Sequence, residues 1–361
     1  MKAKFFLSDE GFGHIVRQRA IIDALLILKP ELSVSIQTQK HLNFAKQNIA
    51  AKEFKDTFNL IKWHKKADSS PDLDAITEYY DNYTSISDDF LIEHAAQSFN
   101  SDFIVSDFVY EAFEIANNQS IPSFGVCHFT WDWFFAKLFP PPISRKVLRR
   151  FFNQAKAADI LFFPPFTPPE ILAFYKDNAC QVPFIRRSFI SHKAWPKNNK
   201  AFKVLVMDSG AGLLKDKILK ALNSLELENT DFFFGSPYLL EIENSFQIPP
   251  NELLIDYINE ADVVIGRPGF NTLSECLSLK KPMLIISEAM NPEMEHNLGE
   301  LKKNRLGAFL SLGDFTDNLP NALTRFFEKE YHNIQEAINA FDAPSNGAEV
   351  IAEIITERVY G

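Results

Sequence analysis

Short apolar runs alternate with helical segments along almost the whole chain, and this alternation constrains the fold more than any other feature. A buried strand, a turn, a helix and then another strand are typical of a parallel sheet with crossover helices. We therefore predict the α/β class. The strands expected in the first half are Lys4–Ser8, Ser33–Thr38, Phe58–Trp63, Asp102–Ser106, Ile121–Cys127 and Ile160–Phe163. A first helix is expected over His14–Leu28.

A polar and basic stretch interrupts the alternation at about 184–202, and we interpret it as a linker. It divides the 361 residues into an N-terminal domain, 1–190, and a C-terminal domain, 203–361. The strands expected in the second domain are Lys203–Met207, Asp231–Phe234, Ala261–Ile265 and Pro282–Ile286, and its helices are 213–225 and the terminal Ala348–Val359. The prediction is two doubly wound, Rossmann-like domains that face each other across a cleft, with a C-terminal helix.

The overall charge and the apolar runs indicate the cellular setting. The chain has 37 Lys and Arg against 47 Asp and Glu, a net charge of −10, so no general positive field favours nucleic acid, and we predict no nucleic-acid partner. The three cysteines are far apart and fit no disulfide framework. No apolar run is long enough for a signal peptide or a membrane span. We expect a cytoplasmic protein.

The first candidate for chemistry is the turn after the first strand, Ser8–Arg17. Gly11 and Gly13 permit a tight turn, and His14 opens the following helix. The positive end of the helix dipole disfavours an imidazolium there, so the ring stays neutral and able to accept a proton. A general base needs this property. The alternative is that His14 only packs at the helix end.

A second candidate, Asp107, ends a buried strand at the same carboxyl edge of the sheet. Its carboxylate could hold the His14 imidazole in the right tautomer and stabilise its charged form, as the acid of a catalytic triad does. The alternative is that Asp107 caps the helix that follows, which is a common role for Asp.

The third candidate lies in the second domain, where a buried strand runs to Ile265 and Gly266 and Gly269 flank a tight loop before a helix. Exposed amides at such a helix start bind diphosphates. Glu275, one turn into the helix, could accept hydrogen bonds from both ribose hydroxyls. The alternative is that Thr272 and Glu275 form a capping box without any ligand.

Glycine is scarce in the chain, with 13 in all, yet it clusters at turns of this kind. Ser209 and Gly210 follow the first strand of the second domain and could bring further backbone amides to the same phosphates. Six of the 13 glycines lie in three strand-to-helix loops, namely Gly11, Gly13, Gly210, Gly212, Gly266 and Gly269. We place these loops around the predicted cleft.

Together these segments resemble the GT-B superfamily of nucleotide-sugar glycosyltransferases, above all the family twenty-eight enzymes that include the lipid II N-acetylglucosaminyltransferase. The stretch Ala261–Glu275 is similar to that family's donor signature. In the first domain, Gly11-Phe-Gly-His14, Ser106-Asp107 and Phe129–Trp133 are similar to the glycosyltransferase-like N-terminal domain of L-arabinokinases.

The resemblance implies an inverting, metal-independent transfer of a hexosyl or N-acetylhexosaminyl group from a nucleotide-diphosphate sugar, expected to be UDP-linked, to a hydroxyl acceptor in bacterial glycan biosynthesis. The acceptor is a glycan, a lipid-linked molecule or a small molecule, and no cofactor or metal is expected. His14 would be the base and Asp107 its orienting acid. The donor-binding residues would be Gly11, Gly13, Ser209, Gly210, Ile255, Arg267, Gly269, Phe270, Asn271, Thr272, Glu275, Glu295, His296 and Asn297.

Two other functions stay open. A nucleotide-sugar hydrolase of the pseudaminic acid pathway has a similar Gly-x-Gly-His-x-x-Arg loop, which Gly11–Arg17 fits. A non-catalytic sugar-nucleotide-binding protein would keep the same fold. A peripheral membrane contact through 131–152 is also considered, since aromatic residues there precede a cationic amphipathic segment. We favour the interpretation in which these aromatic residues face the core.

Overall fold

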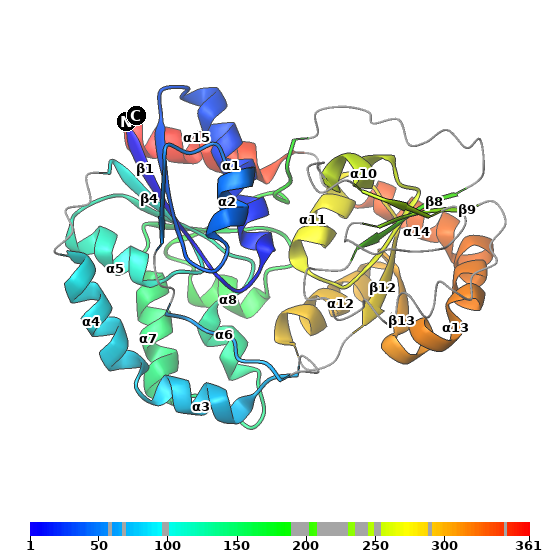
Figure 1. The fold of residues 1–361 in the computed structure, drawn as a ribbon, viewed down its shortest axis with the longest axis horizontal. Coiled ribbons are helices and arrows are strands. Elements are labelled where there is room, and N and C mark those ends of the chain that lie inside the picture. Colours follow the sequence, from blue (N-terminus) through cyan, green and yellow to red (C-terminus); the bar gives the residue numbers. More distant parts are fainter. Residues whose placement is uncertain are drawn as a thin grey trace. The chain divides into compact units, whose positions relative to one another are not determined.

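The computed structural model describes residues 1–56, 60–66, 70–95, 101–188, 202–207, 230–234, 245–248, 254–287, 291–342 and 345–361. The chain forms two compact units (Figure 1). Unit 1 comprises Met1–Ile185 together with Ser345–Gly361, and unit 2 comprises Arg186–Pro344.

Unit 1 contains, within its described residues, a seven-stranded parallel sheet in the order β3-β2-β1-β4-β5-β6-β7. Its strands are β1 (Lys2–Leu7), β2 (Ser33–Thr38), β3 (Glu53–Asp56), β4 (Phe103–Asp107), β5 (Ser123–Val126), β6 (Ile160–Phe163) and β7 (Ala179–Gln181). Its helices are α1 (Phe12–Leu28), α2 (Leu42–Asn48), α3 (Leu73–Asp81), α4 (Tyr83–Ala95), α5 (Glu111–Asn118), α6 (Trp131–Ala136), α7 (Arg145–Lys156), α8 (Pro169–Phe174) and α15 (Gly347–Tyr360). The order reverses between β1 and β4, which is the doubly wound arrangement.

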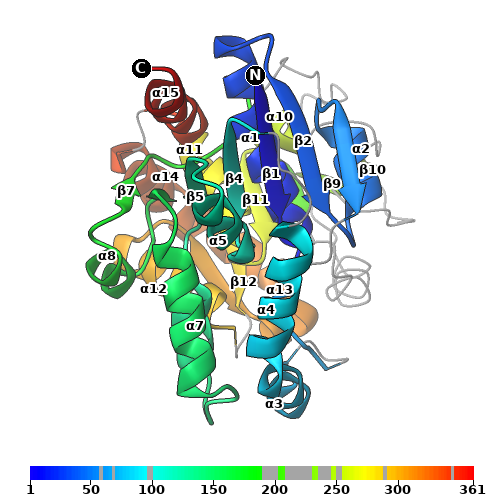
Figure 2. The same cartoon turned by 90° about the vertical axis from the view of Figure 1, so that its left-hand side faces the viewer.

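Successive side chains of β1 point to opposite faces of this sheet and join two different cores. Phe5 and Leu7 pack with the apolar residues of α1 and α15, whereas Phe6 packs with those of α5, α6 and α7. Figure 2 shows α4, α5 and α7 in front of the sheet on the second of these faces. Both faces are therefore covered by helices, as a parallel sheet requires.

The last helix corrects the predicted domain boundary. α15 belongs to unit 1, where Ala348, Ile351, Ala352 and Ile355 are buried beside α1, and Figure 1 shows the two chain ends together there. The backbone N–H of Gly347 donates to the carbonyl of Phe184 at 2.8 Å. The predicted second domain, 203–361, is wrong at its C-terminal end because the apolar face of this helix is buried in the first core.

Unit 2 contains, within its described residues, a six-stranded parallel sheet in the order β10-β9-β8-β11-β12-β13. Its strands are β8 (Phe202–Met207), β9 (Thr230–Phe234), β10 (Ser245–Gln247), β11 (Val263–Gly266), β12 (Met283–Ser287) and β13 (Ala308–Ser311). Its helices are α10 (Leu254–Glu260), α11 (Phe270–Ser278), α12 (Pro292–Asn304), α13 (Leu312–Arg325), the π-helical η1 (Phe326–Glu330) and α14 (Tyr331–Ala340). The order reverses between β8 and β11, so both units are doubly wound and the predicted fold class is confirmed.

One predicted strand is wrong. Residues 60–63 form no strand, and β3 lies earlier in the chain, where it pairs with β2. Leu60 and Ile61 are buried in the core, while the Lys62 backbone exchanges hydrogen bonds with the Tyr80 hydroxyl at 2.9 and 2.8 Å. The apolar run is buried against helix side chains, which produces a strand-like pattern without strand pairing. The predicted helix 213–225 and residues 189–201 of the predicted linker lie outside the described residues.

Candidate functional site

The first candidate site lies where the strand order of unit 1 reverses, between β1 and β4. The two strands pair in register, with Leu7 opposite Asp107, so the turn after β1 meets the end of β4. Gly11 precedes α1 at φ 155°, a conformation that side-chain-bearing residues rarely adopt. This turn places His14 in the first turn of α1, as predicted. Ligands of doubly wound folds bind outside the strand ends at this point of reversal.

His14 and Asp107 are in direct contact. Nδ1 of His14 lies 2.7 Å from Oδ1 of Asp107, and the carboxylate is fully buried whereas the imidazole is 13% exposed. Because an ionised carboxylate only accepts hydrogen bonds, Nδ1 carries the proton and Nε2 has the free lone pair. The histidine therefore has the tautomer that a general base needs. The predicted association of the two residues is confirmed.

Two residues that the sequence analysis did not select complete the surroundings of the Asp107 carboxylate. Arg17 donates from Nε to Oδ2 at 3.0 Å and from NH2 to Oδ1 at 2.6 Å. Gln18 donates from Nε2 to Oδ2 at 2.8 Å. His14, Arg17 and Gln18 are spaced by three and four residues on α1, so they share one helix face. This spacing is the signal that could have identified them.

The charges at this site favour an ionised Asp107. Burial raises the pKa of its carboxyl, but the positive charge of the Arg17 guanidinium and the hydrogen bonds from His14 and Arg17 outweigh burial and hold the pKa well below its usual range. NH1 of Arg17 also lies 3.0 Å from Nδ1 of the buried His128. Arg17 thus joins the carboxylate to a second histidine.

The alternative role of Asp107 as a helix cap is wrong. Tyr110 precedes α5 without any side-chain cap, and the turn is held instead by Ser106, whose Oγ donates to the Val109 carbonyl at 2.6 Å. Phe108 sits in this turn at φ 64°, in the left-handed region that is strained for non-glycine residues. Its ring packs 5.4 Å from the His14 ring, so the strained residue is part of the wall around the histidine.

The second candidate site lies at the point of reversal in unit 2, where β11 leads into α11. Gly266 pairs opposite Met207 of β8, and a Cβ at Gly266 would lie 3.3 Å from the Met207 carbonyl oxygen. Gly269 precedes α11 and has open space around its Cα, with nothing within 4 Å of a Cβ built there. Gly269 has no side chain that could cap the helix, and the first helix amide, that of Phe270, donates to Oε1 of Glu293 at 3.3 Å, so an anion could meet only the amides that follow it. The predicted strand, loop and helix are confirmed.

Glu275 lies inside α11 and is held by Arg187. The guanidinium donates from Nε to Oε1 at 2.7 Å and from NH2 to Oε2 at 3.0 Å, and both side chains are almost fully buried. The alternative, a capping box of Thr272 and Glu275, is wrong, because α11 begins at Phe270 and the Glu275 carboxylate accepts from Arg187. Arg187 lies in the segment that the sequence analysis interpreted as a linker, and its basic character was the only signal.

The other predicted donor residues have several kinds of surroundings. Asn297 is buried and donates from Nδ2 to the Pro268 carbonyl at 2.9 Å, so it supports the loop before α11. The Phe270 backbone N–H donates to Glu293 at 3.3 Å. The Ile255 side chain is fully buried, so only its backbone could face a ligand.

Arg267 is largely buried with NH2 3.6 Å from the Met294 sulfur, whereas Glu295 is exposed. Asn271, Thr272 and His296 are half-buried, and Gly13 lies within α1. Ser209 and Gly210 lie outside the described residues.

The aromatic residues of α6 face the core. Trp131, Trp133, Phe134 and Phe135 are all buried in unit 1, so the core-facing interpretation is confirmed for this cluster, whereas Phe139 in the same stretch is 89% exposed. No helix within the described residues is long and apolar enough to cross a membrane. The same residues contain no group of three or more His, Cys, Asp or Glu side chains that could hold a metal ion. Asp72 caps α3 by accepting from the Ala75 amide.

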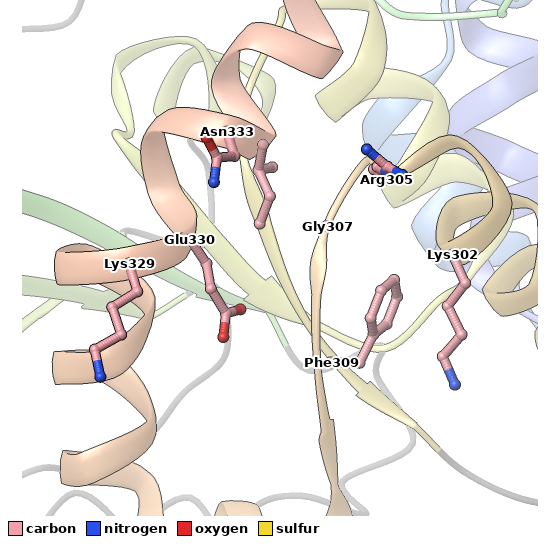
Figure 3. Close-up of a pocket in the computed structure, with 8 residues that line it drawn as sticks. Lys302, Arg305, Gly307, Phe309, Lys329, Glu330 and Asn333 are labelled. Carbon is pink, nitrogen blue, oxygen red and sulfur yellow. The ribbon is translucent and has the colours of Figure 1, made fainter.

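A separate cavity of about 260 Å³ lies between the end of α12, β13 and the η1–α14 segment (Figure 3). Lys302, Arg305 and Lys329 line it together with Glu330, which also pairs with Arg325 at 2.9 Å. None of the sequence-predicted site residues lines this cavity.

Comparison with known proteins agrees with this geometry. Residues 250–353 match the model of the glycosyltransferase family 28 C-terminal domain. The glycosyltransferase SnogD from Streptomyces nogalater is 14% identical with a TM-score of 0.64, over 99% of this chain and 100% of that chain. The spinosyn rhamnosyltransferase SpnG, complexed with thymidine diphosphate, is 14% identical with a TM-score of 0.63, over 98% and 100%. UGT2 of Phytolacca americana, complexed with UDP-2fluoro-glucose and pterostilbene, is 11% identical with a TM-score of 0.66, over the whole of both chains.

The chain has the GT-B glycosyltransferase fold. The resemblance inferred from the sequence is confirmed by this fold and by the family 28 C-terminal domain in residues 250–353. No curated protein matches in a sequence comparison. The family match covers α11 with its preceding loop, which is the second candidate site.

Proposed function

We propose that this GT-B protein transfers a sugar from a nucleotide-diphosphate sugar to a hydroxyl acceptor, with inversion at the anomeric carbon. The observation that carries the proposal is the contact of 2.7 Å between His14 and the buried Asp107 at the strand-order reversal of unit 1. It supplies an oriented base on a fold whose solved relatives include several glycosyltransferases. The family 28 domain supports a donor site in unit 2.

In this mechanism, Nε2 of His14 takes the proton of the acceptor hydroxyl while the oxygen attacks the anomeric carbon. The bond from that carbon to the diphosphate oxygen breaks at the same time, and the nucleoside diphosphate leaves with the electron pair. Asp107 stabilises the imidazolium that forms, because its carboxylate already accepts from Nδ1. Arg17 donates hydrogen bonds to both carboxylate oxygens of Asp107 and so fixes the orientation of this carboxylate. It takes no part in the proton transfer.

The departing diphosphate would bind at the start of α11, where backbone amides and the helix dipole favour a negative charge. The same groups would stabilise the charge that grows on the leaving group, which is why the proposal involves no metal and no cofactor. Glu275 would accept hydrogen bonds from the ribose. We propose a UDP-linked hexose or N-acetylhexosamine as the donor.

A nucleoside diphosphate panel tests the donor half of this proposal. A ligand that binds only the folded state raises its melting temperature, so UDP, thymidine diphosphate, ADP and GDP are compared by thermal shift and then by calorimetry. We expect UDP to bind and Glu275→Ala to weaken its binding by about tenfold, the effect of losing hydrogen bonds to a charged group. Failure of all four diphosphates to bind would contradict the proposal.

A further inference from the structure

Arg187 and Glu275 form a two-point ion pair that the proposed transfer mechanism does not itself require. Nε and NH2 of the guanidinium each donate to a different carboxylate oxygen, at 2.7 and 3.0 Å. The exposed fraction of the side chain is 10% for Arg187 and 5% for Glu275. Arg187 precedes β8, whereas Glu275 lies in α11, so 88 residues of chain separate the partners.

The geometry of the pair leaves hydrogen-bonding capacity on the Glu275 carboxylate. A carboxylate has about four lone-pair positions, two on each oxygen. Arg187 uses one position on each oxygen of Glu275 and leaves a second on each. Two vicinal hydroxyl groups are two donors at neighbouring positions, so a ribose diol matches the positions that remain.

The pair also fixes the direction of the carboxylate. A Glu side chain has three rotatable bonds, and holding it in one rotamer costs conformational entropy. The planar guanidinium fork matches the carboxylate plane, so one Arg sets both the position and the rotation of the acceptor. The positive charge of the guanidinium also offsets part of the cost of burying the carboxylate.

We propose that Arg187 is a positioning residue that presents the Glu275 carboxylate to the ribose diol of the nucleotide. This inference rests on the proposed function, since it requires a nucleotide at α11. It assigns Arg187 no contact with the reacting atoms. Arg187 affects the affinity for the nucleotide, and it does so by orienting Glu275.

A purely structural ion pair would act differently. If the pair only tethers the segment before β8 to α11, its loss would lower stability and weaken all nucleotides alike. If Arg187 positions Glu275 for the diol, its loss would weaken only nucleotides that have the diol. A ligand that lacks both hydroxyls therefore separates the two roles.

The test is calorimetric titration with UDP and with 2′,3′-dideoxyuridine diphosphate. The variants are Arg187→Met, Arg187→Lys and, as a matched control on the same segment, Arg186→Met, whose native guanidinium donates from NH1 to the Arg187 carbonyl at 3.5 Å. We expect wild type to bind UDP about tenfold more tightly than the dideoxy analogue. Arg187→Met should lose this preference while its affinity for the analogue stays within about twofold, as expected when only the diol contacts change.

Arg187→Lys keeps the positive charge but lacks the planar two-point donor of the guanidinium. It should therefore retain part of the preference for UDP over the dideoxy analogue, and it provides a second variant in case Arg187→Met does not fold. Arg186→Met should keep the full preference. An unchanged preference in a folded Arg187→Met or Arg187→Lys protein would overturn this inference and leave the proposed function intact. Failure of wild type to bind any of the four nucleoside diphosphates would contradict the proposed function, and with it the role of Arg187.

Discussion

Nδ1 of His14 and Oδ1 of Asp107 lie 2.7 Å apart, although 93 residues separate them in the chain. The contact exists because β1 and β4 are neighbours in the sheet, so the turn after one strand meets the end of the other. Arg17 shares the same carboxylate, since its NH2 donates to Oδ1 of Asp107 at 2.6 Å. The Asp107 carboxylate thus accepts hydrogen bonds from the His14 imidazole and the Arg17 guanidinium at the same time.

Replacing Asp107 by Asn should destabilise unit 1 in a pH-dependent way. The change leaves the buried Arg17 guanidinium without its counterion, which costs about 3 kcal/mol in the free energy of unfolding. Because the pKa of the Asp107 carboxyl is lowered in the folded state, its stabilisation is complete above the unfolded pKa of about 4 and is lost as the pH falls further. Urea denaturation of both proteins from pH 7 to pH 2 measures the difference.

The free energy of unfolding of wild type should exceed that of Asp107→Asn by a constant amount from pH 7 to about pH 5. This excess should become smaller below about pH 4. If the difference in the free energy of unfolding became smaller as the pH rises toward 8, the carboxyl would not be held ionised by Arg17.

Arg17→Met should lower kcat with little change in the KM for the donor. Without the guanidinium, Asp107 keeps His14 and Gln18 but loses the partner that contacts both of its oxygens. Arg17→Lys keeps the charge but cannot form the two-point contact, so we expect partial recovery of kcat. Steady-state kinetics of the two variants checks this, and a change confined to the donor KM would contradict a role of Arg17 through Asp107.

Gly347→Ala should destabilise unit 1 by about 2 kcal/mol, the cost typical of overpacking. A Cβ there would lie 2.2 Å from the Pro183 carbonyl oxygen, at the start of α15. Gly299→Ala, inside α12, is the matched control, because a Cβ there meets nothing within 4 Å and Ala is favoured in helices by about 1 kcal/mol. Chemical denaturation compares them. Equal free energies of unfolding for the two variants would mean that the start of α15 is not packed against the Pro183 backbone.

The core of each sheet could be predicted from the sequence because β1, β4 and β11 are buried apolar runs, of which β4 ends at Asp107 and β11 at Gly266. The same reasoning predicted the His14–Asp107 contact, since parallel neighbours end at one edge. The strands β7, β10 and β13 were missed because they lie at or next to sheet edges and are short, so their apolar pattern is brief. The partner of α15 was missed because an apolar face does not specify which core covers it.

The site partners were harder to predict than the site itself. Arg17 and Gln18 follow His14 at helical spacing, but only the position of β4 shows that all three reach the same carboxylate. Arg187 lies in a basic stretch without periodicity, and its contact with Glu275 depends on tertiary structure alone. Long-range ion pairs leave no signal in local sequence patterns.

The most direct measurement is the release of nucleoside diphosphate from UDP-sugars by wild type and by His14→Ala, with pooled hydroxyl acceptors present and UDP affinity measured in parallel. The account predicts that His14→Ala lowers the rate by about 10²- to 10⁴-fold, the usual contribution of a general base, while UDP binds as it does to wild type. A His14→Ala protein that releases UDP at the wild-type rate would contradict the account.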